Sequence, residues 1–384
     1  MNKVLRIFCV TIILLTMTSQ VVFASTSKDE LGLNLPVESY VLMEGETGRI
    51  LHEYNADEQL PLASITKIMT MLIAIEAVES GNLTWEEMIT TSEKAKQMTG
   101  TKIFLNISER MSAYDMIKGI AVASANDASV AIAEHMSGSE EAFVKRMNER
   151  ASELGMVNTQ FINAHGLDEP GHYSCARDIA IMSYELIKHD KILEFTSIWM
   201  DSLRNGEFEL VNTNRLLRFY DGTNGLKTGS TDDAGYCISA AAKRNEMQLI
   251  AVIMKAESTT DRFESAKILL DYGFANYTVI NEKASSTPVG ELKVLKGELS
   301  TVTAEMDSDF NVVLPKGQQD KLRKDISMET EFNAPLNRGD KVGEIKYWIN
   351  DEILGSYNII ASETSLRVSL ASMFKIVLEK WICM

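Results

Sequence analysis

The spacing of apolar residues changes along the chain and predicts a first domain that combines strands and helices. Residues 40–43 and 50–54 are rich in apolar side chains and flank a turn with Gly45 and Gly48, which predicts a β-hairpin. The middle of the chain has helical spacing, whereas residues 236–242 and 249–255 again show the pattern of strands. Because strands come from both ends of this region, we predict an α+β domain in which the hairpin joins the late strands in one antiparallel sheet.

The helical patterns of the middle region have recognisable beginnings and ends. The apolar run after Ser64 predicts a buried central helix that stops near Gly81. A second helix is predicted to begin at Ser112, which forms a capping box with Asp115, and to break at residues 124–127. Further helices are predicted over residues 128–136, 139–154, 176–187 and 263–273.

Beyond residue 275 the pattern changes to short strands, which predict a small all-β domain. A β-sandwich is expected, with strands at residues 292–295, 311–314, 328–332 and 346–349. From Ser365 to Met384, apolar residues fall on one broad helical face, with Arg367 and Val368 as exceptions. This pattern predicts an amphipathic helix that lies in a membrane surface, and the alternative is a helix that packs on its own domain.

The first 24 residues have the features of an export signal. Lys3 and Arg6 precede a short apolar run, and a small-residue cleavage site ends at Ala24. An uncleaved N-terminal anchor is the alternative, although the run is short for a membrane span. The patterns therefore divide the chain into an export signal (1–24), a main domain (25–275), a β-sandwich (276–361) and an anchoring helix (362–384).

Charge and composition exclude some partners. The formal net charge is −16, and loss of Lys3 and Arg6 with the signal would make the exported chain more negative still. Such a protein is repelled by nucleic acid. Three cysteines remain after the signal without paired spacing, and the five histidines are scattered, so we predict neither a disulfide framework nor a metal site.

Three polar motifs stand in order along the main domain: Ser64-x-x-Lys67, Ser124-x-Asn126 and residues 227–229, Lys-Thr-Gly. Residues three apart on a helix share a face, so Lys67 can reach the hydroxyl of Ser64. Dehydration in an apolar helix lowers the pKa of a lysine, as a general base that activates a serine requires. Each motif alone also has a structural interpretation, namely a helix start, a helix break and an exposed strand.

Together the motifs resemble those of the D-alanyl-D-alanine carboxypeptidases, the low-molecular-mass penicillin-binding proteins. The resemblance covers essentially the whole exported chain and is carried by residues 62–67, 165–168, 173–178, 225–229 and 334–344. It implies a β-lactamase/transpeptidase-like domain, in which an antiparallel sheet packs with a helical cluster. It also implies a small all-β domain and a C-terminal helix that holds the enzyme at the extracytoplasmic face of the cell membrane.

The resemblance also implies a reaction. Ser64 attacks the carbonyl between the two terminal D-alanines of a peptidoglycan stem peptide, and Lys67 takes the serine proton. D-alanine leaves, and water hydrolyses the acyl-serine. Ser124 relays a proton to the leaving amine, and Asn126 contacts the peptide group of the substrate. β-Lactam antibiotics acylate the same serine, and no metal or organic cofactor is required.

The remaining motif residues are expected to bind the substrate. Lys227 depresses the pKa of Lys67 and attracts the terminal carboxylate, to which Thr228 can hydrogen-bond. Gly229 lets the substrate backbone lie against the strand. The backbone N–H groups of Ser64 and Ser230 form the oxyanion hole.

Some features depart from the family or leave alternatives open. Several relatives carry histidine at the position of Ser230, which bears on substrate preference and pH dependence. His165 and Arg177 match the family, but we interpret them as a loop anchor and an ion-pair partner. A class A β-lactamase, a D,D-endopeptidase or transpeptidase, and a penicillin-binding wall module without turnover are the alternative functions. The Glu-x-x-Leu-Asn string expected of that β-lactamase does not occur between the second and third motifs of this sequence.

Overall fold

The computed structural model describes residues 32–284 and 288–369. The predicted export signal and most of the predicted C-terminal helix lie outside these residues. Within them, no helix is both long enough and apolar enough to cross a membrane.

The main domain is built on a five-stranded antiparallel sheet. Its order is β2-β1-β9-β8-β7, with bounds Ile50–Tyr54, Ser39–Glu44, Met247–Ala256, Gly235–Arg244 and Thr223–Thr231. The first hairpin pairs with the late strands, as predicted. The long apolar runs of β8 and β9 are buried at nearly every position, which indicates that both faces of the sheet are covered.

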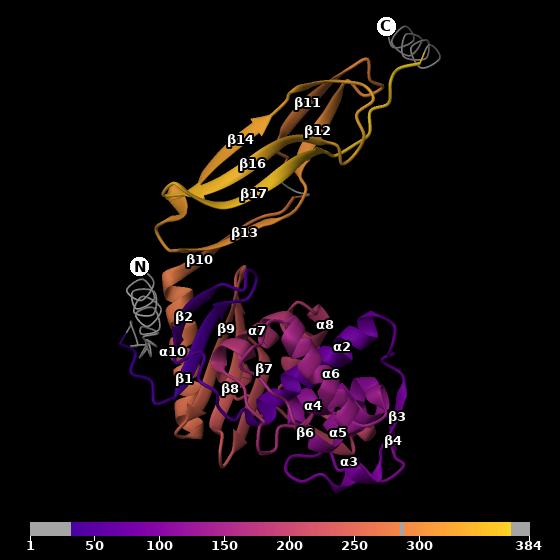
Figure 1. Cartoon of the computed structure of the whole chain (residues 1–384), viewed down its shortest axis with the longest axis vertical. Coiled ribbons are helices and arrows are strands. Elements are labelled where there is room, and N and C mark those ends of the chain that lie inside the picture. The colour runs from indigo at the N-terminus through magenta and orange to yellow at the C-terminus, as the bar shows by residue number, and fades with distance from the viewer. Residues whose placement is uncertain (1–31, 285–287, 370–384) are drawn as a thin grey trace, which may run out of the picture. The chain divides into compact units, whose positions relative to one another are not determined.

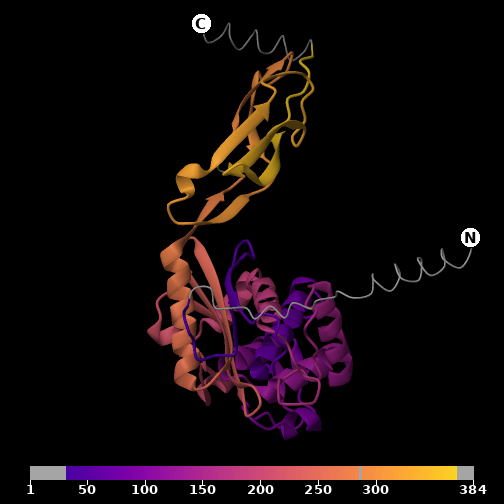
Figure 2. The same cartoon turned by 60° about the vertical axis from the view of Figure 1, so that its left-hand side comes forward.

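Helices cover the two faces of the sheet unequally. Helix α10 (Thr259–Asn276) packs on one face, and a helical cluster lies on the other (Figure 1). The view in Figure 2 shows the same two-sided arrangement. The cluster contains α2 (Lys67–Glu79), α4 (Ala113–Ala123), α5 (Asn126–Ser137), α6 (Glu140–Glu153), α7 (Ala176–Ile187) and α8 (Asp190–Thr196). The predicted α+β class is therefore confirmed.

Helix α2 is the centre of the cluster because its sequence is apolar on almost every side. Ten of its thirteen residues are buried, including Lys67. A 3₁₀ turn, η1 (Ala63–Thr66), precedes it, so Ser64 lies in this tight turn and not in the α-helix itself. Side chains three apart eclipse one another in a 3₁₀ helix, which places Lys67 directly over Ser64.

The break between α4 and α5 follows from local backbone chemistry. Ser112 caps α4 by accepting a hydrogen bond from the Asp115 N–H group. Ser124 ends α4 in the left-handed conformation, with φ of 59°, and α5 starts two residues later. The turn thus presents residues 124–126 at one end of both helices.

Shorter elements complete the main domain. They comprise α3 (Glu93–Gln97), α9 (Leu216–Phe219), the 3₁₀ turn η2 (Arg204–Gly206), and the strand pairs β3 (Met88–Thr90) with β4 (Arg110–Ser112) and β5 (Met200–Leu203) with β6 (Phe208–Val211). The sequence pattern predicted none of these elements, because each is too short to show a period.

The second domain is all-β. Six strands form one sheet in the order β14-β16-β17-β12-β11-β15, with bounds Arg323–Met328, Lys341–Ile349, Glu352–Ala361, Thr301–Met306, Gly290–Leu295 and Glu331–Asn333. Strands β10 (Tyr277–Glu282) and β13 (Phe310–Pro315) form a second sheet, and a short turn, η3 (Gln319–Lys321), follows β13. Both sheets contribute to one apolar core.

Two details of the second domain differ from the sequence prediction. A single strand over residues 328–332 is wrong, because β14 ends at Met328 and β15 begins at Glu331, at opposite edges of the sheet. A helix that begins at residue 362 or at Ser365 is also wrong. Ser365 is buried and bridges Leu336, and Arg367 bridges Gly297. Residues 365–369 alternate polar and apolar, which is the period of a strand and explains why Arg367 and Val368 did not fit the helical face.

Candidate functional site

Ser64 and Lys67 lie together, as their spacing predicted. The Nζ atom of Lys67 is 2.9 Å from the Oγ atom of Ser64. Lys67 also contacts the Oδ1 atom of Asn126, at 2.7 Å, and the backbone carbonyl of His165. Ser64 is partly exposed, whereas Lys67 is fully buried. The Ser64 hydroxyl, which is accessible to solvent, therefore contacts the Lys67 amine, which is not.

The surroundings of Lys67 favour its neutral form. Burial holds its pKa well below the ordinary value, and the nearby charge of Lys227 lowers it further, against an opposing effect of Asp127. The carbonyl of His165 and the Oδ1 atom of Asn126 can only accept hydrogen bonds, so both N–H groups of a neutral amine are used there. The nitrogen lone pair is then left to face the Ser64 hydroxyl, as general-base catalysis requires.

The turn between α4 and α5 places Ser124 and Asn126 in the same site. The Nδ2 atom of Asn126 donates to the Thr99 carbonyl at 2.7 Å, which fixes the Oδ1 atom towards Lys67. The carbonyl of Ser124 accepts a hydrogen bond from the Thr101 hydroxyl at 2.7 Å. The segment that ends at Thr101 therefore stabilises the turn between α4 and α5. Asn126 therefore forms a hydrogen bond with Lys67, and the sequence did not predict this contact.

The third motif lies on β7, which is an edge strand and faces the start of α2. A Cβ atom at Gly229 would lie 2.9 Å from the Ser64 nitrogen, so only glycine allows this approach. Lys227 is buried, and its Nζ atom donates to the Thr228 carbonyl at 3.0 Å. Burial first, and then the charge of Arg262, lower the pKa of Lys227 to about 7.

A cleft of about 310 Å³ opens over Ser64. Its lining includes Ser124, Asn126, Thr228, Gly229 and Ser230, so the structure brings five further predicted residues to one surface. Lys227 lies behind this surface and does not line it. The lining described here contains no Asp or Glu side chain.

The cleft also contains residues that the sequence did not single out, notably Thr101, Thr213 and Arg262. Thr213 accepts a hydrogen bond from the Thr228 hydroxyl at 2.6 Å. Arg262 is 7% exposed and donates to the Gly229 carbonyl at 3.2 Å. The sequence does contain a pattern that could have indicated Arg262. It has the helical spacing of the residues on the buried face of α10, namely Ala266, Leu269, Leu270 and Gly273.

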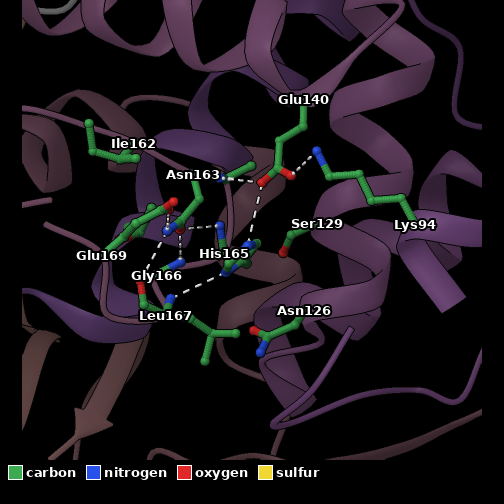
Figure 3. Close-up of polar contacts among 12 residues, drawn as sticks. Lys94, Asn126, Ser129, Glu140, Ile162, Asn163, His165, Gly166, Leu167 and Glu169 are labelled. Carbon is green, nitrogen blue, oxygen red and sulfur yellow. Dashed lines mark hydrogen bonds and ion pairs between the residues drawn. The ribbon is translucent and has the colours of Figure 1, made fainter. Parts of the chain in front are cut away.

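The loop of residues 163–171 lies beside Lys67, which contacts the His165 carbonyl, and Figure 3 shows the polar contacts around Asn163 and His165 in this loop. The Asn163 side chain accepts hydrogen bonds from the N–H groups of His165 and Gly166 and donates to the Leu167 carbonyl. Gly166 has φ of 85° and packs directly on the Ala63 carbonyl, where a Cβ atom would overlap it. The loop thereby supports the turn that carries Ser64.

We expect Gly166→Ala to lower the rate of Ser64 acylation by about 100-fold, because a displacement near 1 Å at the nucleophile has effects of this size. Gly171→Ala is the matched control: its φ is 87°, but its nearest new contact would be at 3.8 Å. Both variants pay about 1–2 kcal/mol for the left-handed backbone. Thermal unfolding and penicillin-labelling rates of the two proteins measure the difference, and equal acylation rates would contradict the role of the loop.

His165 and Arg177 occupy structural positions, as the interpretation from sequence proposed. Arg177 pairs with Asp57 at 2.7 Å and with Glu53 at 2.9 Å, away from the cleft. His165 contributes its carbonyl to Lys67, and burial, with Lys67 and Lys94 nearby, lowers the pKa of its ring to about 3. No group of three His, Cys, Asp or Glu residues that could hold a metal ion occurs among the described residues.

Family models match both domains. The model of the D-alanyl-D-alanine carboxypeptidases matches residues 23–258, and the model of the C-terminal domain of penicillin-binding protein 5 matches residues 278–365. The chain is 38% identical over 385 residues to the D-alanyl-D-alanine carboxypeptidase DacF of Bacillus subtilis, with 99% of each chain covered. It is 33% identical to the carboxypeptidase DacC of Escherichia coli, over 86% of this chain and 84% of DacC.

Solved structures give the same result. Penicillin-binding protein 5 from Haemophilus influenzae has a TM-score of 0.71 and 31% identity, over 87% of this chain and 98% of that one. Penicillin-binding protein D2 from Listeria monocytogenes, in the ampicillin-bound form, has a TM-score of 0.58 and 33% identity, over 63% of this chain and 99% of that one.

The fold and the family models together define a serine hydrolase, and its cleft contains a Ser-x-x-Lys motif. The chain belongs to the D-alanyl-D-alanine carboxypeptidase family of low-molecular-mass penicillin-binding proteins. The resemblance seen in the sequence motifs and the two-domain fold that it implied are both confirmed.

Proposed function

We propose that the enzyme removes the terminal D-alanine from peptidoglycan stem peptides through an acyl intermediate on Ser64. The observation that carries the proposal is the 2.9 Å contact between the Ser64 hydroxyl and the buried amine of Lys67. Lys67 takes the serine proton as Ser64 attacks the carbonyl between the two D-alanines. D-alanine leaves, and a water molecule then hydrolyses the ester.

The residues around Ser64 have assigned roles in this proposal. Ser124 relays the proton to the leaving amine, and the second N–H of the Asn126 amide contacts the substrate peptide. The backbone N–H groups of Ser64 and Ser230 stabilise the oxyanion, a contribution worth about 3 kcal/mol for each donor. The substrate backbone lies along β7 beside Gly229, because an edge strand leaves backbone groups open to pairing.

Positive charge at one end of the cleft is proposed to bind the terminal carboxylate of the substrate. The buried Lys227 supplies this positive charge from behind the cleft surface, and Thr228 presents a hydroxyl in the cleft. Arg262, which lines the cleft, adds a second positive charge that the sequence did not indicate. A substrate with a free C-terminal carboxylate is therefore favoured over one whose terminus is amidated.

The test is release of D-alanine from diacetyl-Lys-D-Ala-D-Ala, with covalent labelling by fluorescent penicillin measured in parallel. We expect both, and we expect the penicillin adduct to persist, because the described cleft lining holds no carboxylate to activate a deacylating water. Rapid turnover of penicillin would favour the β-lactamase alternative. Labelling without D-alanine release would favour a binding module, and cleavage of cross-linked dimers would add endopeptidase activity.

We expect Lys227→Ala to slow cleavage of the free-carboxylate substrate by about 10- to 100-fold, which corresponds to the loss of a hydrogen bond to a charged group. The amidated analogue should lose far less, because it lacks the charge that Lys227 attracts. Lys243→Ala on the neighbouring strand β8 removes an equal but exposed charge and serves as the control. Equal losses on both substrates would contradict the role of Lys227 in carboxylate binding.

We also propose that the enzyme is exported and attached to the outer surface of the cell membrane by the segment after residue 369. The sequence of this segment supports the proposal, because Leu370, Phe374 and Trp381 belong to one apolar set in a helical pattern. Burial of such side chains stabilises attachment by up to about 1.5–3 kcal/mol each.

Removal of residues 370–384 is therefore expected to release the enzyme from membranes, whereas high salt should leave the intact protein attached. The cut falls after Ser369 because Ser365 and Arg367 belong to the β domain. Flotation with liposomes measures attachment, and unchanged carboxypeptidase activity of the shortened protein shows that the fold is intact. Full-length protein that does not float at either salt concentration would contradict the anchor.

A further inference from the structure

A buried carboxylate lies behind the catalytic base and has no part in the mechanism so far. Glu140 begins α6, and its side chain is 7% exposed. Its Oε1 atom accepts the Ala164 N–H at 3.0 Å and lies 3.5 Å from the Nε2 atom of His165. Its Oε2 atom is 3.0 Å from the Nζ atom of Lys94 on α3. Figure 3 shows Glu140 between Lys94 and the loop that carries His165.

Two residues, Ala164 and His165, connect Glu140 to Lys67. Glu140 accepts the Ala164 N–H, and the Thr70 hydroxyl donates to the Ala164 carbonyl at 2.7 Å. The next carbonyl, that of His165, is one of the two acceptors that orient the Lys67 amine. A shift of these two residues would therefore turn the lone pair of Lys67 away from Ser64.

The His165 ring strengthens the same connection. Its Nδ1 atom accepts the Leu167 N–H at 3.2 Å, so the proton of the neutral ring is on Nε2, which faces Glu140. The ring stays neutral at physiological pH, since its pKa is lowered to about 3. Glu140 thus contacts the backbone of Ala164 and the ring of His165, the residue whose carbonyl contacts Lys67.

Lys94 pairs with two carboxylates, those of Glu140 and Glu141. Burial lowers the pKa of Lys94, but its bonds to Glu141 and Glu140 outweigh this effect and raise the pKa above its ordinary value, so Lys94 remains a cation. The other charged or titratable groups that face Lys67 or Glu140 are Lys227 on β7, Asp127 on α5, and His165 and His172 in the loop. Loss of either Glu140 or Lys94 would change the net charge behind the base.

We infer that Glu140 is a positioning residue for the Lys67 base: it fixes Ala164, the neighbour of His165, and with Lys94 it sets the charge behind Lys67. The inference rests on the proposed role of Lys67. It predicts that Glu140, which does not line the cleft, affects the rate and the pH dependence of Ser64 acylation.

Four single variants of the full-length exported enzyme test the inference by fluorescent-penicillin acylation rates from pH 5 to pH 10. Glu140→Ala removes the acceptor for the Ala164 N–H and should slow acylation by about 100-fold. Glu140→Gln keeps an acceptor of the same size and should restore the rate at its optimum to within about threefold. Glu141→Gln is the matched control, because Glu141 also pairs with Lys94 but is exposed and does not touch the loop.

The pH profile separates a role in positioning and charge from a general loss of folding. Glu140→Gln removes one negative charge behind the base, which disfavours protonated Lys67, so the acidic limb of the profile should move to lower pH. Lys94→Met, the fourth variant, removes one positive charge there, so the limb should move to higher pH. The double variant should return the limb close to that of the wild-type enzyme.

Opposite shifts of the acidic limb support the inference even where Glu140→Ala fails to fold, which thermal unfolding would reveal. Unmoved limbs, shifts in one direction, or wild-type acylation by a folded Glu140→Ala protein would overturn it. Release of D-alanine by the wild-type enzyme is measured separately. A wild-type enzyme that takes penicillin but releases no D-alanine would reject the proposed function, while its acylation rates would still report on Lys67.

Discussion

Ser64→Ala is expected to abolish both D-alanine release and covalent attachment of penicillin. Loss of the nucleophile in a serine enzyme of this kind costs about 10⁶-fold in turnover. The substitution removes one oxygen from a partly exposed side chain, so the fold should remain intact. The result is therefore a loss of chemistry and not of the site.

Mass spectrometry of the penicillin-treated variant provides the measurement. The wild-type protein should gain the mass of one penicillin molecule, on the peptide that contains Ser64, whereas Ser64→Ala should gain none. Ser139→Ala serves as a control, since Ser139 caps α6, is partly exposed and does not line the cleft. A penicillin adduct on the Ser64→Ala protein would mean that another group is the nucleophile.

The positions of the motif residues could be predicted because each motif coincides with a helix start, a helix break or a strand that short stretches of sequence determine. The apolar run after Ser64 forms a buried helix, and α4 ends at Ser124, within the predicted break at residues 124–127, although α5 already begins at Asn126. Both events are decided within a few residues, so they are visible in the sequence. The same is true of strands β8 and β9, whose continuous apolar runs are long enough to be recognised.

Contacts between distant segments could not be read from those patterns. The amide of Asn126 was expected to face the substrate, but one of its atoms holds Lys67, 59 residues away. Arg262 reaches the cleft only because α10 packs on the sheet beside Gly229, and the topology that brings them together is a property of the whole fold. Glu140 likewise has an ordinary helix-start position until α6 packs behind the loop that carries His165.

The predicted start of the C-terminal helix was wrong for a different reason. A helical wheel accepts a few exceptions, so Arg367 and Val368 were tolerated although they follow the period of a strand. Pairing with Gly297 and Leu336, which are distant in sequence, decided the outcome. Edge pairing of this kind depends on the register of a completed sheet and leaves little local signal.

Lys67→Arg is expected to slow acylation of Ser64 by about 100- to 10,000-fold, the range of general acid–base catalysis. A guanidinium group stays protonated in proteins and cannot accept the serine proton. Lys67→Met, which removes the amine and keeps the length, should lose a similar amount. A Lys67→Arg enzyme that acylates at near wild-type speed would mean that another group is the base.

The lowered pKa of Lys67 predicts how the wild-type enzyme responds to pH. Acylation requires the neutral amine, so its rate should fall as the pH drops below the folded-state pKa of Lys67 and should level off above it. Burial, the largest physical cause, and the charge of Lys227 both lower this pKa. Acylation rates measured with penicillin across the pH range give the midpoint directly.

The same shift makes stability depend on pH, in the same direction as a salt-bridged carboxylate whose folded-state pKa is lowered. Between the lowered pKa of folded Lys67 and the ordinary value of 10.5, the unfolded chain binds a proton that the folded enzyme does not. The free energy of unfolding should therefore rise with pH in this window, by up to about 1.4 kcal/mol per pH unit. Lys227, with a folded pKa of about 7, adds a similar rise above that pH.

Urea unfolding at several pH values from 6 to 10 measures this rise. Lys67→Met removes the contribution of Lys67 and should flatten the curve by one proton, whereas Lys243→Met, at an exposed position on β8, should leave the slope unchanged. If Lys67→Met and the wild-type enzyme gain stability with pH in parallel, then Lys67 is protonated in the folded protein. It could not then act as the base that activates Ser64.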